Sequence, residues 1–200
     1  MSNFTYQGNP IHNLETYEWD NIWWEHAENA DKERVLIVGD SISCGYRTIV
    51  NQMLNENMYA DGFGTSKACD NKQYISAIRY VISQQSKKPK KILFNNGLHG
   101  WHLSTEEYKK HYNNLVEKIL NEWPEIELIL MLSTPTKNNE KLKVIERNCA
   151  VIEIANQYNL KVIDLYNEIF GNEQLISQDD VHLIKEGYEK LARLICKYII

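Results

Sequence analysis

The sequence predicts an α/β protein, a three-layer α/β/α sandwich built on a flavodoxin-like parallel sheet of five strands. Short apolar runs alternate with amphipathic segments of roughly 12 to 20 residues, the pattern of βαβ units. Hydrophobic residues make up 43 % of the 200 residues and charged residues 24 %, a balance that supports one sizeable core. Neither an internal repeat nor a low-complexity segment interrupts this alternation.

The predicted strands are the apolar runs, and the first, Val-Leu-Ile-Val before Gly39, is typical of a buried parallel strand. The strand near residues 58–60 is the weakest, and we expect a glycine-bearing turn at residues 61–64 after it. The strands are predicted at residues 35–38, 58–60, 91–94, 126–132 and 160–163.

The predicted helices lie between and after these strands. Ser104 and Glu107 have the spacing of a capping box, which marks a helix start. The helices are predicted at residues 42–56, 72–85, 104–123, 140–158 and 184–198. Right-handed crossovers follow, and ligands bind beyond the carboxyl ends of such strands. The residues just after each strand are therefore the candidates for chemistry.

Two regions are expected along the chain. Residues 1–32 are rich in aromatic residues without a regular period, and we expect an N-terminal extension that packs on the core. One of its tryptophans walling a substrate pocket is the alternative. Residues 33–200 carry the alternating pattern and form the main domain.

Charge and composition exclude several classes of function. The net charge of −5 argues against nucleic acid, which needs clustered Lys and Arg. The lysines at 87, 88, 90 and 91 form the only basic cluster, and we interpret it as a solvated loop. No apolar run approaches the ~20 residues of a membrane span. Residues 1–10 lack the apolar core of a signal peptide, so we expect a cytoplasmic protein.

The cysteines indicate free thiols. The four of them lie far apart and form no CxxC pair, which disfavours both zinc and a disulfide framework.

Gly39-Asp40-Ser41 follows the first predicted strand, so Ser41 is expected at the start of a helix on the carboxyl edge of the sheet. The free N–H groups and partial positive charge of a helix N-terminus favour an oxyanion next to a nucleophile. The alternative is that Asp40 or Ser41 is only an N-cap.

Asp179 and His182 lie three residues apart, just before the last predicted helix. At this spacing a carboxylate can orient an imidazole. A serine hydroxyl needs an adjacent base, and this pair would supply one to Ser41. The alternative is a solvated turn.

The segment after the strand at residues 91–94 gathers amides, imidazoles and glycines. Asn96 or His99 could donate a hydrogen bond to an oxyanion, and Trp101 could shape a pocket wall. A turn with a core histidine is the alternative. Metal binding by His99 and His102 is disfavoured, because no third ligand stands out.

Together these segments resemble the SGNH/GDSL hydrolase family. Its first block, GDS, is similar to residues 39–41, and its fifth, DxxH before a glycine-containing helix start, is similar to residues 179–188. In the third block, GxND, His99 occupies the asparagine position. The glycine of the second block corresponds to Gly64 or, less well, to Gly62.

The resemblance implies the SGNH fold for residues 33–200 and a Ser-His-Asp mechanism with Ser41, His182 and Asp179, without cofactor or metal. It also implies an oxyanion hole formed by the N–H groups of Ser41 and Gly64, completed by Asn96 or His99.

A polar and aromatic pocket rim is expected from Trp101, His102 and Tyr46. It indicates a carboxylic ester with a small acyl group, such as acetyl on a carbohydrate. A thioesterase, a lysophospholipase and a non-catalytic binding module are the alternatives. A nucleotide binder is disfavoured, because Asp40 would repel a phosphate in the first loop. The oligomeric state stays open, and the N-terminal aromatics would allow a homodimer.

Overall fold

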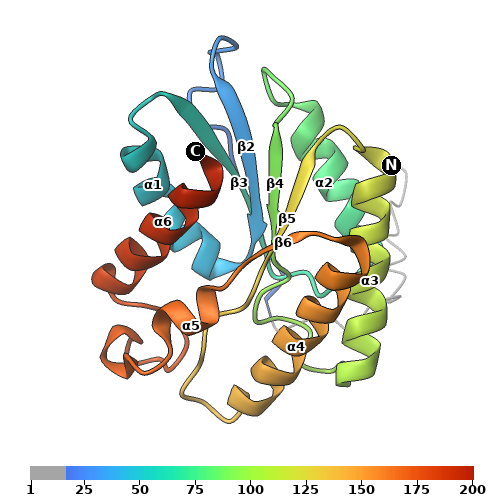
Figure 1. The fold of residues 1–200 in the computed structure, drawn as a ribbon, viewed down its shortest axis with the longest axis vertical. Helices are drawn as coiled ribbons and strands as arrows, with labels where there is room; N and C mark the ends of the chain where they lie inside the picture. The colour runs from blue at the N-terminus through green and yellow to red at the C-terminus, as the bar shows by residue number, and fades with distance from the viewer. Residues whose placement is uncertain (1–16) are drawn as a thin grey trace, which may run out of the picture.

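A computed structural model describes residues 17–200. One mixed β-sheet forms the centre of the molecule (Figure 1). The strand order is β1-β3-β2-β4-β5-β6. The strands are β1 (Asp20–Trp23), β2 (Glu33–Gly39), β3 (Met58–Thr65), β4 (Lys91–Phe94), β5 (Glu127–Met131) and β6 (Lys161–Ile163). All neighbours pair in parallel except β1 and β3, so the carboxyl ends of β2 to β6 meet at one edge.

Helices cover both faces of the sheet (Figure 1). One face carries α2 (Tyr74–Ser83), α3 (Thr105–Glu122) and α4 (Lys141–Tyr158). The other carries α1 (Ser41–Leu54), α5 (Leu165–Ile169) and α6 (Lys185–Ile199), with a short 3₁₀ helix, η1 (Glu173–Leu175), before α6. The predicted three-layer α/β/α sandwich is confirmed.

Because side chains along each strand point alternately to the two faces of the sheet, the interior is divided into two cores. Leu36 and Val38 of β2 belong to the core under α2, α3 and α4, whereas Val35 and Ile37 belong to the core under α1 and α6. Successive side chains of a strand point to opposite faces of a sheet. A strand buried on both faces therefore has a continuous apolar sequence, which is why β2 is recognisable from its sequence.

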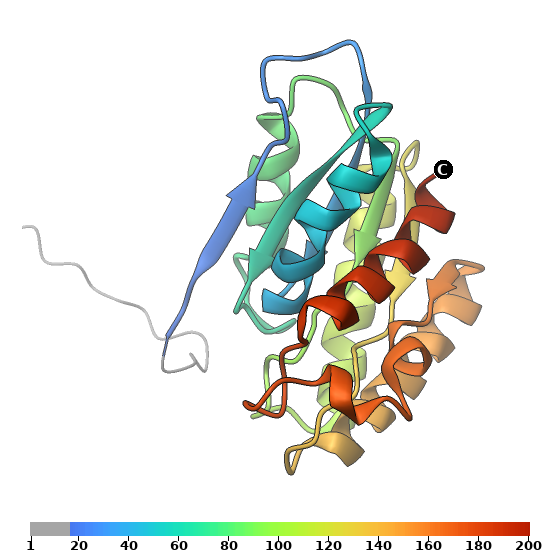
Figure 2. The same cartoon turned by 90° about the vertical axis from the view of Figure 1, so that its left-hand side faces the viewer.

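The prediction of five parallel strands is wrong by one strand, because β1 adds an antiparallel edge beside β3 (Figure 2). It belongs to the segment expected to be irregular. Three of its four residues are exposed, and only Ile22 is partly buried. A strand with so little burial shows no apolar alternation in its sequence.

The glycine-bearing turn predicted at residues 61–64 is also wrong, since β3 continues through these residues to Thr65. Its glycines make room for α1. A Cβ on Gly62 would lie 2.3 Å from Cδ of Arg47, and one on Gly64 would lie 2.3 Å from Sγ of Cys44.

A buried arginine ties the described part of the N-terminal extension to the sheet. Arg34, fully buried in β2, donates to the carbonyl oxygens of Glu25, His26 and Asn29 at 2.8–2.9 Å. It also forms an ion pair of 2.7 Å with the buried Asp61 of β3. These contacts hold the segment at residues 25–29 against the sheet. Residues 1–16 of the predicted extension lie outside the described residues.

Helix termini follow their sequence signals. The capping box of Ser104 and Glu107 is confirmed at the start of α3.

The lysines of the basic cluster have separate partners. Lys87 and Lys90 form ion pairs with Glu33. Lys91 begins β4, and its ammonium group donates to the carbonyl oxygens of Tyr198 and Ile199 at the end of α6. Within residues 17–200, none of the helices combines the length and apolar character needed to cross a membrane.

Candidate active site

The first candidate residue, Ser41, begins α1 and is separated from the carboxyl end of β2 only by Asp40. Asp40 is the N-cap, and its Oδ1 accepts a hydrogen bond of 2.9 Å from the N–H of Ile42. Because Asp40 supplies the cap, the Ser41 hydroxyl takes no part in capping.

His182 lies within hydrogen-bond distance of Ser41. Its Nε2 is 2.8 Å from Ser41 Oγ, although 141 residues separate the two in sequence. Its Nδ1 is 2.6 Å from Oδ2 of Asp179. The three side chains form one line of hydrogen bonds, and the imidazole retains 42 % side-chain exposure, so a substrate can reach it.

The carboxylate of Asp179 is fixed by donors on its other oxygen. Oδ1 accepts from the hydroxyl of Ser177 at 2.7 Å and from the N–H groups of Val181 and His182 at 3.0 and 2.8 Å. These hydrogen bonds, that of Ser177 first, hold the pKa of Asp179 well below its ordinary value. The carboxylate therefore stays ionised and can stabilise a protonated imidazole.

The backbone around this turn is held at several points. Ser177 N donates to His182 O at 2.7 Å, and Ile176 bridges Leu183. Asp180 has a left-handed φ of 65°, and its carbonyl accepts from the N–H of Lys137 at 2.9 Å. The Asp-x-x-His segment is thus a closed turn anchored to the segment after β5.

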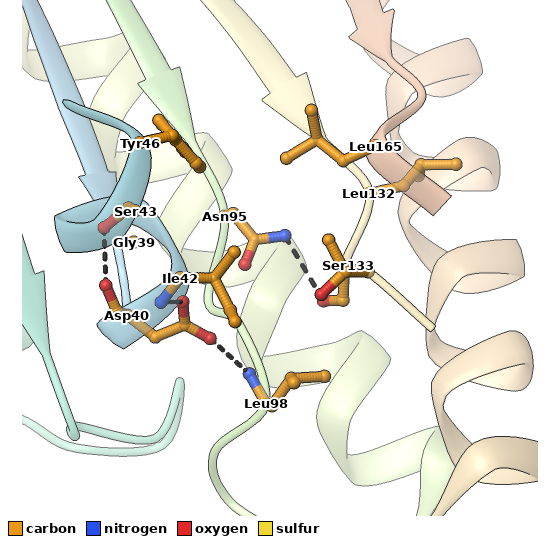
Figure 3. Close-up of a pocket in the computed structure, with 11 residues that line it drawn as sticks. Gly39, Asp40, Ile42, Ser43, Tyr46, Asn95, Leu98, Leu132, Ser133 and Leu165 are labelled. Carbon is orange, nitrogen blue, oxygen red and sulfur yellow. Dashed lines mark hydrogen bonds between the residues drawn. The ribbon is translucent and has the colours of Figure 1, made fainter. Parts of the chain in front are cut away.

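The loop after β4 is attached to the start of α1 through Asp40. Figure 3 shows this carboxylate between Ile42 and Leu98, and its Oδ2 accepts from the N–H of Leu98 at 2.9 Å. Gly97 has a φ of 70°, and a Cβ there would lie 2.0 Å from the same carboxylate oxygen. Glycine is required at residue 97 for both reasons.

The two candidate oxyanion donors of this loop have different environments. Asn96 is fully buried, and its Nδ2 donates to Lys67 O at 3.0 Å. His99 is half-buried, with its ring centre 6.1 Å from that of Trp19 in an edge-to-face contact. The side chain of Asn96 is thus enclosed and bonded to the backbone, whereas that of His99 is partly exposed.

The two candidate glycines of the second block also differ. Gly64 pairs with Gly39, and a Cβ on Gly64 would lie 3.3 Å from the carbonyl oxygen of Asp40. Gly62 lies two residues earlier in β3, against Arg47. Gly64 is therefore the one that lies beside Asp40 and the start of α1.

No protein-family model matches the sequence, and a comparison with curated proteins finds no match. Solved structures do match. An acetyl xylan esterase, AlAXEase, superposes with a TM-score of 0.67 at 18 % identity, over 84 % of this chain and 100 % of that one. A GDSL-like lipase from Bacteroides thetaiotaomicron gives 0.67 at 17 % identity, over 84 % and 87 % of the two chains. An acetylxylan esterase from Geobacillus stearothermophilus superposes with a TM-score of 0.62 at 17 % identity, over 84 % of this chain and 94 % of that one.

The chain has the SGNH hydrolase fold.

Within this fold, the predicted pocket residues have separate fates. Tyr46 does not reach the rim, because its side chain is 1 % exposed and its hydroxyl contacts Sδ of Met131 at 3.7 Å. Five residues after Ser41, a helical position points away from the nucleophile and into the core. Trp101 and His102 lie on the loop after β4, where His102 Nε2 is 3.0 Å from Oδ2 of Asp70.

Three residues make contacts near the site that the sequence did not predict. Asp40 joins α1 to the loop after β4, Trp19 packs edge-on against His99, and Arg147 binds the backbone of the same loop. Of the three, only Asp40 was indicated by the sequence, because a short polar side chain before a helix predicts an N-cap. The sequence did not indicate that Asp40 also links two segments.

Metal-ligating side chains do not cluster in residues 17–200, where no group of three or more His, Cys, Asp or Glu could hold an ion. At this edge of the sheet, a hydroxyl, an imidazole and a carboxylate follow one another along a line of hydrogen bonds. A serine hydroxyl is a stronger nucleophile when a base lies beside it.

Proposed function

We propose that the chain is a serine ester hydrolase in which Ser41 is the nucleophile, His182 the general base and Asp179 the group that orients the base. The observation that carries this proposal is the line of hydrogen bonds from Asp179 Oδ2 through His182 to Ser41 Oγ, at 2.6 and 2.8 Å. Solved esterases and a lipase of the same fold support it.

In the proposed reaction, Ser41 Oγ attacks the ester carbonyl while its proton passes to Nε2 of His182. Asp179 stabilises the resulting imidazolium through Nδ1–H. The N–H groups of Ser41 and Gly64, with the side chain of His99, bind the tetrahedral oxyanion, and loss of one such donor typically lowers turnover by ~10²–10³-fold. His182 then protonates the leaving alcohol. Water, deprotonated by His182, releases the acid and regenerates Ser41. No cofactor enters this sequence.

A non-catalytic binding module explains the site less well. Asp179 is held by three donors and in turn fixes the imidazole, and that imidazole meets the hydroxyl of Ser41. Binding a ligand does not require a base beside a serine, whereas catalysis by serine does.

The proposed substrate is an ester of a small acyl group, such as an acetylated carbohydrate. Two of the solved structures above are acetyl xylan esterases. An apolar groove exists between α4 and α5, bordered by Leu142, Ile145 and Phe170, but no residue of the proposed triad lines it. This groove therefore does not offer a channel to a long acyl chain on Ser41. Thioesterase or lysophospholipase activity remains the alternative.

The test is hydrolysis of p-nitrophenyl acetate by wild type and by Ser41→Ala. We expect turnover to fall by at least about 10³-fold in the variant. A fluorophosphonate probe should label wild type at Ser41, located by mass mapping, and should leave Ser41→Ala unlabelled. A folded wild type that neither turns over nor labels would refute the proposal.

A substrate panel then addresses the acyl group. Acetylated xylo-oligosaccharides, an octanoyl ester, a lysophospholipid and an acyl thioester are compared by kcat/KM. We expect the acetyl carbohydrate to be preferred, and a preference for the octanoyl ester, lysophospholipid or thioester would identify the alternative.

A further inference from the structure

Arg147 of α4 is a buried cation whose hydrogen-bond partners within residues 17–200 are carbonyl oxygens. Its side chain is almost fully buried, with 2 % exposure of the residue. Burial lowers the pKa of this guanidinium, but arginine stays charged in proteins. A buried charge is costly unless several strong partners satisfy it, so its partners show what it holds in place.

All three carbonyl partners belong to the loop after β4. Arg147 donates to the carbonyl oxygens of His99 at 2.8 Å and Gly100 at 2.6 Å, with a longer contact of 3.5 Å to that of Leu103. Two aromatic rings add cation–π contacts, with Cζ 4.6 Å from the ring centre of Trp101 and 4.4 Å from that of Tyr108. One side chain thus connects α4, α3 and the loop.

The backbone of this loop is fixed on both sides of His99. The N–H of Leu98 is held by the carboxylate of Asp40, and the carbonyl of His99 is held by Arg147. Gly100 has a φ of 74°, a conformation that favours glycine, and its carbonyl meets the same cation as that of His99. With the backbone fixed at these points, the direction in which the side chain of His99 leaves the loop is set.

We infer that Arg147 is a positioning residue, which sets the His99–Trp101 segment so that the His99 side chain meets the oxyanion. The inference rests on the proposed function. Arg147 does not touch the reacting atoms. It acts through the backbone of the loop, and a displacement of about 1 Å at such a donor can cost on the order of 10²-fold in rate.

Arg34 provides a matched control. It is fully buried, it donates to three carbonyl oxygens of one loop, and its Cζ lies 5.2 Å from the ring centre of Tyr59. It lies near the amino end of β2, however, whereas Ser41 follows the carboxyl end of that strand. Loss of Arg34 should lower stability without displacing His99.

The experiment compares Arg147→Lys, Arg147→Met and Arg34→Lys with wild type, using p-nitrophenyl acetate well below the Tm of each variant. Circular dichroism gives the folded fraction. We expect kcat to fall about 10-fold in Arg147→Lys and about 10²-fold in Arg147→Met, with KM changed less than threefold, because a misplaced oxyanion donor affects the transition state alone. Arg34→Lys should keep its kcat within about twofold despite a lower Tm.

The rate of fluorophosphonate labelling at Ser41 should fall in the same order, since the probe also develops negative oxygen character. If both Arg147 variants fail to fold, Tyr108→Leu tests the inference. It removes one ring beside the guanidinium, and kcat should fall about threefold to tenfold, because the loop would be held less firmly.

Equal loss of kcat per folded molecule in the Arg147 and Arg34 variants would overturn the inference, as would a folded Arg147→Met or Tyr108→Leu with wild-type kcat. These results leave the proposed function intact, because wild type still turns over and labels. An inert wild type overturns the proposed function and this inference together, and is thereby distinguished from them.

Discussion

The two carboxylate oxygens of Asp40 accept hydrogen bonds from different segments, Oδ1 from Ile42 of α1 and Oδ2 from Leu98 of the loop after β4. The first bond caps the helix and leaves the Ser41 hydroxyl to His182. The second keeps the loop of His99 against the start of the same helix. One buried aspartate thus couples the position of the proposed nucleophile to that of the proposed oxyanion donor.

Asp179→Asn should lower kcat by about 10²- to 10⁴-fold with little change in KM. An amide cannot stabilise the imidazolium, and it favours the wrong tautomer of His182. Steady-state kinetics on p-nitrophenyl acetate measure the effect. Asp180→Asn is the control, because it removes the same charge one residue away, and asparagine tolerates the left-handed backbone there. Equal losses in the two variants would contradict the assigned role of Asp179.

Because the pKa of Asp179 is lowered in the folded protein, Asp179→Asn should also change how stability depends on pH. The hydrogen bond from Ser177 and those from the backbone favour the ionised form, so the folded-state pKa lies below the ordinary 3.8. Their contribution to stability is therefore present above pH 3.8 and is lost as the pH falls through the folded-state pKa. The difference in Tm between wild type and Asp179→Asn should therefore shrink as the pH falls below about 4.

Gly64→Ala and Gly62→Ala should separate activity from packing in β3. A Cβ on Gly64 would contact Cys44 and approach the carbonyl oxygen of Asp40, beside the proposed oxyanion hole. A Cβ on Gly62 would press on the aliphatic part of Arg47. We expect both to lower Tm, but only Gly64→Ala to lower kcat per folded molecule, by about 10²-fold. The reverse order would assign Gly62 to the oxyanion hole.

Between elements, the contact of α1 with α6 depends on a missing side chain. Gly45 lies in the interior of α1, where glycine normally costs about 0.5–1 kcal/mol relative to alanine. A Cβ at residue 45 would lie 2.3 Å from Cε1 of Tyr188, in the ring that packs against it. The close approach of the two helices therefore outweighs helix propensity.

Gly45→Ala should accordingly destabilise the protein, by about 1–3 kcal/mol, because overpacking exceeds the gain in helix propensity. Urea unfolding measures the change. Thr48→Ala, at an exposed position of the same helix, is the control and should be neutral or slightly stabilising. A stabilised Gly45→Ala would mean that α6 can move away at little cost.

The elements that could be predicted from the sequence are those whose burial appears as an apolar run. β2, β4 and β5 lie inside the sheet between two layers of helices, and each contains a continuous apolar run after its first charged residues. β1 is an exposed edge, and β3 contains two glycines and a buried aspartate. Their strand conformation depends on Arg34 and α1, which lie elsewhere in the sequence, so local patterns missed β1 and shortened β3.

The same distinction holds at the candidate site. Ser41, Asp179 and His182 were recognisable because each lies in a short local motif at a strand or helix boundary. Tyr46 was misplaced, since its direction depends on how α1 rotates against the sheet. The function of Arg147 was not predictable, because its partners are backbone carbonyls some 44 to 48 residues away.

For the whole molecule, the two cores share one sheet, and each contains one buried cysteine. Cys69 belongs to the core under α2, α3 and α4, and Cys196 to that under α1 and α6. Burial raises the pKa of the Cys69 thiol to about 12 and also raises that of Cys196. Both thiols are thus protected twice, by exclusion of reagent and by suppression of the thiolate. Cys149, on α4, is exposed.

Iodoacetamide labelling of the native protein, followed by peptide mass mapping, tests whether the two cores open together. Cys149 should react at once, whereas Cys69 and Cys196 should react slowly and with the same dependence on urea, because removing either helical layer exposes the shared strands. Cys196 lies near the chain end, but Lys91 holds the carbonyls of Tyr198 and Ile199 and so restrains the last turn of α6. If Cys196 reacts much faster than Cys69 without urea, α6 opens locally. Lys91→Met should produce that behaviour by design, since it removes the donor from those carbonyls while keeping the apolar length of the side chain.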